Sequence, residues 1–266
     1  MSELKMSHED GLAVVEICRE ERRNALNGPL WDALADAARS LRENPPRAVI
    51  VTGRGGHFCA GMDLSFGNPL IERLAPAVMN KDMDALRELI RGLKEILFAF
   101  GEIPCPVIAA VEGACAGGGL ELALACDLRV ASRDAFFSLP ETHVGMLPDL
   151  GGTVRVTHLL GQARATEFIL SGRRMKAEEA YALGLVNRLT DPGNALGATR
   201  ELIAELSKSG PEATREVLTV LRSTGRDPAA YDRETEAGAR ALATAECLEG
   251  VQAFMEKRPP RWAQPE

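Results

Sequence analysis

The sequence predicts an α/β fold for most of the chain and a helical region at its C-terminal end. Three short apolar runs, residues 12–18, 47–52 and 106–111, have the length and composition of buried strands. A helical pattern follows the first run, and four of its residues share one face: Leu30, Leu34, Ala38 and Leu41. Strand and helix therefore alternate along the chain, which is typical of an α/β fold.

The remaining segments continue this alternation. Residues 66–100 have a largely helical pattern, and a glycine-rich turn after residue 111 leads into a helix from Leu120 to Cys126. Short strands are predicted at residues 128–131, 135–138 and 185–189, and helices at 154–160, 163–170 and 177–183. From Asn194 onward nearly the whole pattern is helical.

Composition limits the classes of function. The 266 residues are 45% hydrophobic and 26% charged, which is ordinary for a globular protein. A net charge of -7 disfavours a protein that neutralises a nucleic-acid backbone. Residues 1–11 lack the features of a signal peptide, and no apolar run is long enough to cross a membrane, so we expect a cytoplasmic protein. The six cysteines form no Cys-x-x-Cys pair, which predicts free thiols and no metal site.

Two glycine-containing segments are candidates for binding an anion. Residues 117–119 are three glycines where a helix begins, so their peptide N–H groups are free to point at a ligand. Taken alone, such a triplet is more often a tight turn. Residues 57–63 could present a second N–H group, and two converging donors would form an oxyanion hole, in which each donor is worth about 3 to 4 kcal/mol of transition-state stabilisation.

Three acids lie among apolar and turn residues. Glu121 is in the first turn of the helix that follows the glycines, where it either complements the helix dipole or, if buried, has a raised pKa suited to proton transfer. Glu141 and Asp149 are each consistent with a cap or a loop acid, or with one half of an acid/base pair. The histidines His57, His143 and His158 lie in no nucleophile motif, and we interpret them as structural.

Taken together, these segments resemble the enoyl-CoA hydratase/isomerase (crotonase) family over nearly the whole chain. The resemblance rests on a linked series of segments: 58–64 (FCAGMDL), 106–122 (PVIAAVEGACAGGGLEL), 126–127 (CD), 140–141 (PE) and 151–153 (GGT). Three further stretches match the family: 23–27 (RNALN), 180–186 (AYALGLV), and a C-terminal signature from residues 249–250 (EG) to 257–258 (KR).

The resemblance implies a crotonase-like spiral of β-β-α turns with a C-terminal helical trimerisation region. It divides the chain into a core at residues 1–195, which binds CoA and carries the catalytic residues, and an oligomerisation region at residues 196–266. It also implies a homotrimer or a hexamer. The partner is an acyl-CoA thioester, with no nucleic acid and no membrane, and no cofactor is expected because the coenzyme A belongs to the substrate.

The site residues implied by the resemblance are backbone donors and carboxylates. The N–H groups of Met62 and Gly118 form the oxyanion hole, and Glu121 with Glu141 holds the water that adds to a 2-enoyl-CoA. The expected contacts to substrate or CoA are Arg23, Ala25, Leu26, Ala60, Asp63, Leu64 and Gly117, and Arg22, Arg23 and Arg54 are candidate phosphate ligands. The acyl pocket is expected between residues 64 and 83 and near Met146.

Asp149 departs from the pattern of typical hydratases, which have a small residue there, whereas several isomerases of the family have an acid. Dienoyl-CoA isomerases resemble the chain at Glu141 and Asp149 but have Asp in place of Glu121. An enoyl-CoA or dienoyl-CoA isomerase is therefore the alternative to a hydratase. A non-enzymatic RNA-binding or scaffold protein is a third reading, which the acidic charge and the intact glutamate pair disfavour.

Overall fold

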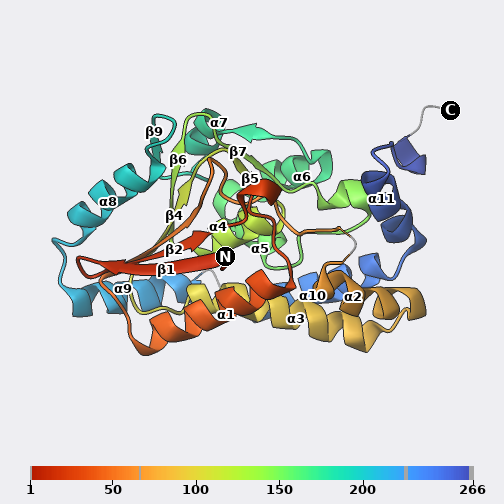
Figure 1. The fold of residues 1–266 in the computed structure, drawn as a ribbon, viewed down its shortest axis with the longest axis horizontal. Coiled ribbons are helices and arrows are strands. Elements are labelled where there is room, and N and C mark those ends of the chain that lie inside the picture. Colours follow the sequence, from red (N-terminus) through yellow and green to blue (C-terminus); the bar gives the residue numbers. More distant parts are fainter. Residues whose placement is uncertain (1, 66, 225–226, 264–266) are drawn as a thin grey trace.

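The computed structural model describes residues 2–65, 67–224 and 227–263, and within them it has two β-sheets and eleven α-helices (Figure 1). The strands are β1 (Leu4–Glu9), β2 (Leu12–Ile17), β3 (Ala48–Gly53), β4 (Val107–Val111), β5 (Ala114–Ala116), β6 (Leu128–Ser132), β7 (Phe136–Ser138), β8 (Met175–Lys176) and β9 (Arg188–Thr190). The helices are α1 (Gly28–Glu43), α2 (Pro69–Asn80), α3 (Met83–Phe100), α4 (Gly118–Ala125), α5 (Gly152–Leu160), α6 (Gln162–Ser171), α7 (Ala177–Ala182), α8 (Ala195–Leu206), α9 (Pro211–Thr224), α10 (Pro228–Leu242) and α11 (Ala245–Met255). Three short 3-10 turns are η1 (Glu20–Arg22), η2 (Glu141–Val144) and η3 (Arg261–Ala263). The predicted α/β fold is confirmed.

The larger sheet has helices on both faces. Its strand order is β1-β2-β3-β4-β6-β9, parallel throughout except for β1, which runs antiparallel at the edge. Alternate residues of β3 face opposite sides: Val49 and Val51 belong to the core under α1 and α3, and Ile50 packs against α8. Because both faces of the central strands are buried, their sequences are continuous apolar runs without polar alternation.

The smaller sheet produces the spiral of β-β-α turns. β4 pairs in the large sheet, β5 then pairs with β7 in the small sheet (order β5-β7-β8), and α4 follows. β6 and β7 repeat this division between the sheets and lead through η2 to α5. Each turn of chain therefore ends with a helix that starts beside the small sheet, and the starts of α4 and α5 lie next to each other.

Sequence patterns missed several elements for identifiable reasons. β1 was not predicted because it is an edge strand with mainly polar, partly exposed side chains. β5 and β8 are too short, at 3 and 2 residues, to show a periodicity. Residues 66–100, predicted as largely helical, contain two helices, α2 and α3. The chain turns between them because Lys81 has a left-handed conformation (φ 52°) and Asp82 caps α3.

The helical C-terminal prediction is confirmed for the described residues, and these helices pack on the same chain. α8 covers the large sheet, and α10 lies along α3. The residues of α10 that pack inward follow a helical spacing: Tyr231, Glu234, Thr235, Gly238, Ala239 and Leu242. The division of the chain at residue 195 into core and oligomerisation region stays a prediction. No helix among the described residues has the length and apolar character needed to cross a bilayer.

Candidate active site

A small cavity of about 90 Å³ brings together the acids and glycines singled out in the sequence. Glu121, Glu141 and Asp149 all line it, as do the two predicted donors Met62 and Gly118. The rest of the wall is apolar and comes mainly from α2, α3 and α10: Leu64, Leu70, Ile71, Leu74, Leu89, Ile90, Leu93, Met146, Leu147, Leu150 and Leu242. Residues from the two segments expected to form an acyl pocket, 64–83 and the neighbourhood of Met146, therefore line this cavity, together with residues of α3 and α10 that were not predicted.

Two peptide N–H groups converge at the edge of this cavity. A Cβ built on Gly118 would lie 3.9 Å from the Met62 nitrogen, so the two residues face each other at close range. The segment around Met62 is held by two backbone bonds to Leu26, which donates to the Gly61 oxygen (2.8 Å) and accepts from the Asp63 nitrogen (2.9 Å). Neither the Met62 nor the Gly118 N–H donates a hydrogen bond within the described residues. Both are available to an oxygen between them.

The start of α4 requires glycine for steric reasons. Gly117 has φ +52°, and a Cβ there would lie 3.2 Å from Glu141 Oε1. At Gly119 a Cβ would lie 2.5 Å from the Cys59 carbonyl oxygen, which is too close for any side chain. The triplet therefore does more than form a turn, because it lets the backbone approach both the acid and the neighbouring strand-like segment.

Glu121 is held in a fixed orientation. It is 2% exposed, and its Oε1 accepts hydrogen bonds from the N–H groups of Leu150 (2.8 Å) and Gly152 (2.9 Å). Burial raises its pKa well above the ordinary range, and the charges of Glu141, Asp149 and Glu234 add to the rise. A Cβ on Gly152 would lie 2.7 Å from Oε1, so this position must also be glycine for the contact to form.

Glu141 is a buried acid without a protein partner. Both of its carboxyl oxygens are inaccessible to water and neither has a hydrogen-bond partner within the described residues. Burial raises its pKa to about 8, with a further contribution from Asp149. It is therefore a neutral acid at pH 7, and its O–H is available to a ligand in the cavity.

Asp149 belongs to the same group of acids. It lies just before the start of α5, and burial raises its pKa to about 7, with Glu234 adding to the rise and Lys94 opposing it. Its carboxylate packs directly against α10, because a Cβ on Gly238 would lie 2.2 Å from Asp149 Oδ2. Asp149 is thus part of the cavity wall and not a surface loop acid.

The residues expected to contact CoA lie on the segments that flank Met62. Arg23 and Ala60 are exposed, Leu26 is fully buried, and Leu64 is half-buried. Ala25 and Gly117 are also partly or wholly enclosed beside this segment. Of the candidate phosphate ligands, Arg22 and Arg23 are exposed, and Arg54 is paired with Glu16 at 2.5 Å.

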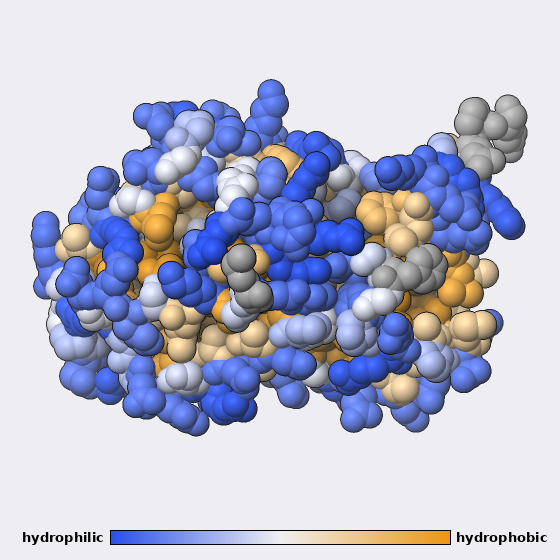
Figure 2. Space-filling view, in the orientation of Figure 1, coloured by the Kyte–Doolittle hydropathy of each residue, from blue (hydrophilic) through white to orange (hydrophobic). Residues whose placement is uncertain are grey.

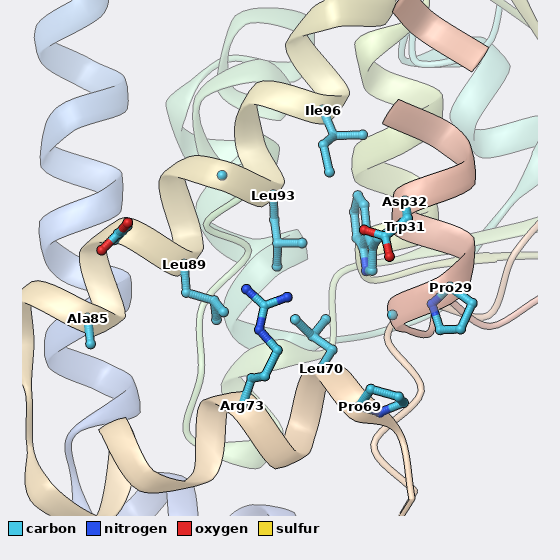
Figure 3. A pocket seen from close by; sticks show the side chains of 13 residues that line it. Pro29, Trp31, Asp32, Pro69, Leu70, Arg73, Ala85, Leu89, Leu93 and Ile96 are labelled. Atoms are coloured by element: carbon cyan, nitrogen blue, oxygen red, sulfur yellow. The ribbon is translucent and has the colours of Figure 1, made fainter. Parts of the chain in front are cut away.

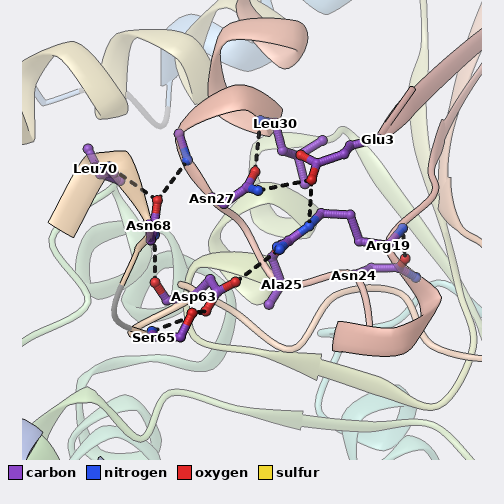
Figure 4. Close-up of polar contacts among 11 residues, drawn as sticks. Glu3, Arg19, Asn24, Ala25, Asn27, Leu30, Asp63, Ser65, Asn68 and Leu70 are labelled. Atoms are coloured by element: carbon purple, nitrogen blue, oxygen red, sulfur yellow. Dashed lines mark hydrogen bonds and ion pairs between the residues drawn. The ribbon is translucent and has the colours of Figure 1, made fainter. Parts of the chain in front are cut away.

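Asp63 has a different environment from the one expected of a CoA ligand. It is 8% exposed, accepts from Arg19 (3.0 Å) and from the Ser65 hydroxyl (2.6 Å), and its carbonyl accepts from Asn68 (Figure 4). Asn68 in turn accepts from the Gly28 and Leu70 nitrogens at the starts of α1 and α2. The Asp63 side chain therefore fixes the loop that carries Met62, with Arg19 as a partner that sequence reasoning did not identify.

A larger groove of about 680 Å³ lies next to the small cavity, between α1, α2 and α3 (Figure 3). Trp31 and Asp32 line it from α1, Arg73 from α2, and Ile96 from α3. Three leucines line both spaces: Leu70, Leu89 and Leu93. They form the partition between the reactive cavity and the groove.

Sequence reasoning also missed Lys94 and Glu234, which form a buried ion pair of 2.8 Å beside Asp149. A signal was present in each case. Lys94 lies on the apolar face of α3 between Ile90 and Leu97, and Glu234 lies on the inward face of α10. A charged residue on an otherwise apolar helical face indicates a buried partner.

Comparisons with known proteins identify the family of the chain. The model of the enoyl-CoA hydratase/isomerase family matches residues 7–265. A carnitinyl-CoA dehydratase of Salmonella agona is 37% identical over 249 residues, which cover 91% of each protein. Solved structures of an enoyl-CoA hydratase from Mycobacterium avium subsp. paratuberculosis (28% identity, TM-score 0.84, 98% of this chain and 99% of that one) and of a carnitinyl-CoA hydratase from Mycobacterium avium (30%, TM-score 0.82, 99% of each) share the fold. The chain belongs to the enoyl-CoA hydratase/isomerase family.

Proposed function

We propose that the protein is a hydratase that adds water across the double bond of a 2-enoyl-CoA thioester. The observation that carries this proposal is the pair of buried glutamates in one cavity with two unpaired N–H groups. The thioester oxygen accepts from the Met62 and Gly118 N–H groups, which stabilise the negative charge that develops on it when water adds. The proposed reaction needs no cofactor, because the coenzyme A is part of the substrate.

The two glutamates differ in a way that suits them to opposite roles. Burial raises the pKa of both glutamates, and we assign the charged form of the pair to Glu121 because two N–H groups donate to it, whereas Glu141 has no donor. Glu121 therefore takes a proton from the water whose oxygen bonds to C3, and Glu141 delivers its proton to C2 as the enolate collapses. A proton then returns from Glu121 to Glu141, and the pair is ready for the next substrate. The similarity to a carnitinyl-CoA dehydratase, whose name denotes the removal of water, supports hydration over isomerisation.

The reaction class is tested by incubating the pure protein with crotonyl-CoA, 3-enoyl-CoA and 3,5-dienoyl-CoA esters while following absorbance and product mass. We expect crotonyl-CoA to gain one water, and the Asp149→Asn variant to retain this activity within about tenfold, because Asp149 takes no part in the proposed proton transfers. Isomerisation at unchanged mass, lost in Asp149→Asn, would instead assign the reaction to Glu141 and Asp149.

The leucines between the small cavity and the larger groove should limit the length of the acyl chain that the site accepts. Because only leucine side chains separate the small cavity from the larger groove, Leu89→Ala should open a path for longer chains. We expect the ratio of kcat/KM for dodecenoyl-CoA to that for crotonyl-CoA to rise roughly tenfold. Leu86→Ala is the matched control, since Leu86 is buried on the same helix but lines neither space. An equal change in both variants would show that the partition does not limit chain length.

We further propose that the protein acts as a homotrimer or hexamer. Hydrophobic side chains interrupt the mainly hydrophilic surface (Figure 2), and three of them form an exposed stripe on α9: Val217, Val220 and Leu221. Such a stripe at helical spacing is typical of an interface. Light scattering of the purified protein measures the mass directly.

A further inference from the structure

The buried ion pair between α3 and α10 is connected to the reacting carboxyls through one short stretch of backbone. Lys94 is 5% exposed, and its ammonium binds Glu234 Oε2 (2.8 Å), the Thr235 hydroxyl (2.8 Å) and the Tyr231 carbonyl (3.0 Å). All three partners belong to α10. The ammonium therefore has three acceptors, and the Glu234 carboxylate is held against it.

Glu234 also binds the start of α5. Its Oε2 accepts from the Gly151 nitrogen (2.9 Å) and its Oε1 from the Val154 nitrogen (3.2 Å). Glu121 accepts from the neighbouring peptides, those of Leu150 and Gly152. Glu121 and Glu234, from different helices, thus bind N–H groups that alternate along residues 150–154, where the chain enters α5. A displacement of either carboxylate must therefore move the backbone that orients the other.

A contribution to stability does not by itself explain why the Lys94–Glu234 pair is buried. A buried ion pair loses hydration on both partners and is often no more stabilising than an apolar pair of similar size. Lys94 and Glu234 are 5% and 4% exposed, in a molecule whose other inward-facing α3 residues are apolar. Their contacts with the loop at residues 150–154, and their effect on Asp149, point to the neighbouring site.

We propose that Glu234, held by Lys94, is a positioning residue that fixes the backbone on which Glu121 rests. The proposal rests on the proposed function, because it treats Glu121 as a reacting group. Glu234 lines no part of the cavity and acts through the Gly151 and Val154 peptides and through its charge.

The charges that face the site come from several elements. Glu121 faces the charges of Glu141 from η2, Asp149 from the loop before α5, and Glu234 from α10. Asp149 faces Glu234 from α10 and Lys94 from α3. Burial raises the pKa of the Cys247 thiol on α11, and the charge of Asp149 adds to this rise. Burial raises the pKa of Asp149 most, Glu234 raises it further and Lys94 lowers it, while for Glu121 the contribution of Glu234 follows those of burial, Glu141 and Asp149. Because Glu121 is the base of the proposed mechanism, removing the Glu234 charge should move the acidic limb of the pH profile to lower pH.

The test uses Glu234→Gln, whose single amide oxygen can accept from only one of the Gly151 and Val154 N–H groups. We expect kcat for crotonyl-CoA hydration to fall roughly tenfold with KM little changed, because misplacement of a reacting group costs rate and not binding. We expect the acidic limb of kcat to move to lower pH, because the Glu234 charge, which raises the pKa of the base Glu121, is gone.

The matched control is Glu236→Gln, which makes the same substitution on the same helix in a surface pair with Arg87. It should leave both kcat and the pH profile unchanged. A wild-type profile in Glu234→Gln, or a loss of thermal stability with no change in the profile, would overturn the proposal. Glu121→Gln, assayed in parallel, separates the two hypotheses: if it is active, the proposed function is wrong; if it is inactive while Glu234→Gln is normal, only the positioning role is wrong.

Discussion

Replacing either member of the glutamate pair by glutamine is expected to lower kcat for crotonyl-CoA hydration by about 1000-fold. Glutamine has nearly the same shape, and in Glu121→Gln its oxygen can still accept from Leu150 and Gly152. It cannot take a proton from water, and at residue 141 it cannot deliver one to C2. Because the Met62 and Gly118 N–H groups are untouched, the affinity for the thioester should stay within a few-fold of the wild type.

Two measurements separate chemistry from binding in these variants. Stopped-flow absorbance gives kcat, and calorimetric titration with butyryl-CoA, which has no double bond to hydrate, gives the affinity for the acyl thioester. Glu236→Gln serves again as the control, since its carboxylate lies at the surface. Turnover above about a tenth of the wild-type value in either variant would contradict the two-carboxylate mechanism.

Sequence patterns predicted those parts of the fold in which burial or close packing restricts the residue types at each position. The strands at residues 47–52 and 106–111 were recognisable because both faces of a parallel strand are buried and only apolar residues serve there. The glycine triplet was visible in the sequence because the close packing of the backbone there admits no side chain. A Cβ at Gly119 would collide with the Cys59 carbonyl oxygen. The polar edge strand β1 has neither kind of constraint, since it pairs only with β2 among the described strands and its side chains are partly exposed.

The site was predicted as a set of residues but not as an arrangement. The acids and donors could be named from the sequence, and the structure places Glu121, Glu141, Asp149, Met62 and Gly118 around one cavity. Periodicity cannot show that α10 returns to α3, because their contact joins residues more than a hundred positions apart, such as Lys94 and Glu234. Nor can it show that Asp63 binds Arg19 from another loop. Contacts of this kind depend on tertiary packing.

Burial of Glu141 should also make the protein less stable as the pH rises, and Glu141→Gln should remove this effect. The folded-state pKa of about 8 lies above the unfolded value of about 4.5, so between these values the folded protein holds a proton that the unfolded chain has released. The stability that the neutral carboxyl provides is therefore complete below about pH 4.5 and is lost as the pH rises to about 8. The free energy of unfolding of the variant relative to the wild type should increase by about 4 kcal/mol over this interval, since each pKa unit is worth about 1.4 kcal/mol and the titration is half complete at either end.

Urea unfolding at several pH values from 5 to 9 measures this difference, and the cost of burying the glutamine amide cancels because it does not depend on pH. The control Glu236→Gln should show no pH-dependent difference from the wild type over this range, because the Arg87 hydrogen bond lowers the pKa of Glu236 below 4.5 and the carboxylate is charged in both the folded and the unfolded state above pH 5. Parallel pH curves for Glu141→Gln and the wild type would mean that Glu141 is ionised in the folded protein at neutral pH. A charged Glu141 could not deliver a proton to C2, so that result would also remove its proposed role as the acid. The burial that weakens the fold at alkaline pH is, on this mechanism, what keeps the acid protonated where the enzyme works.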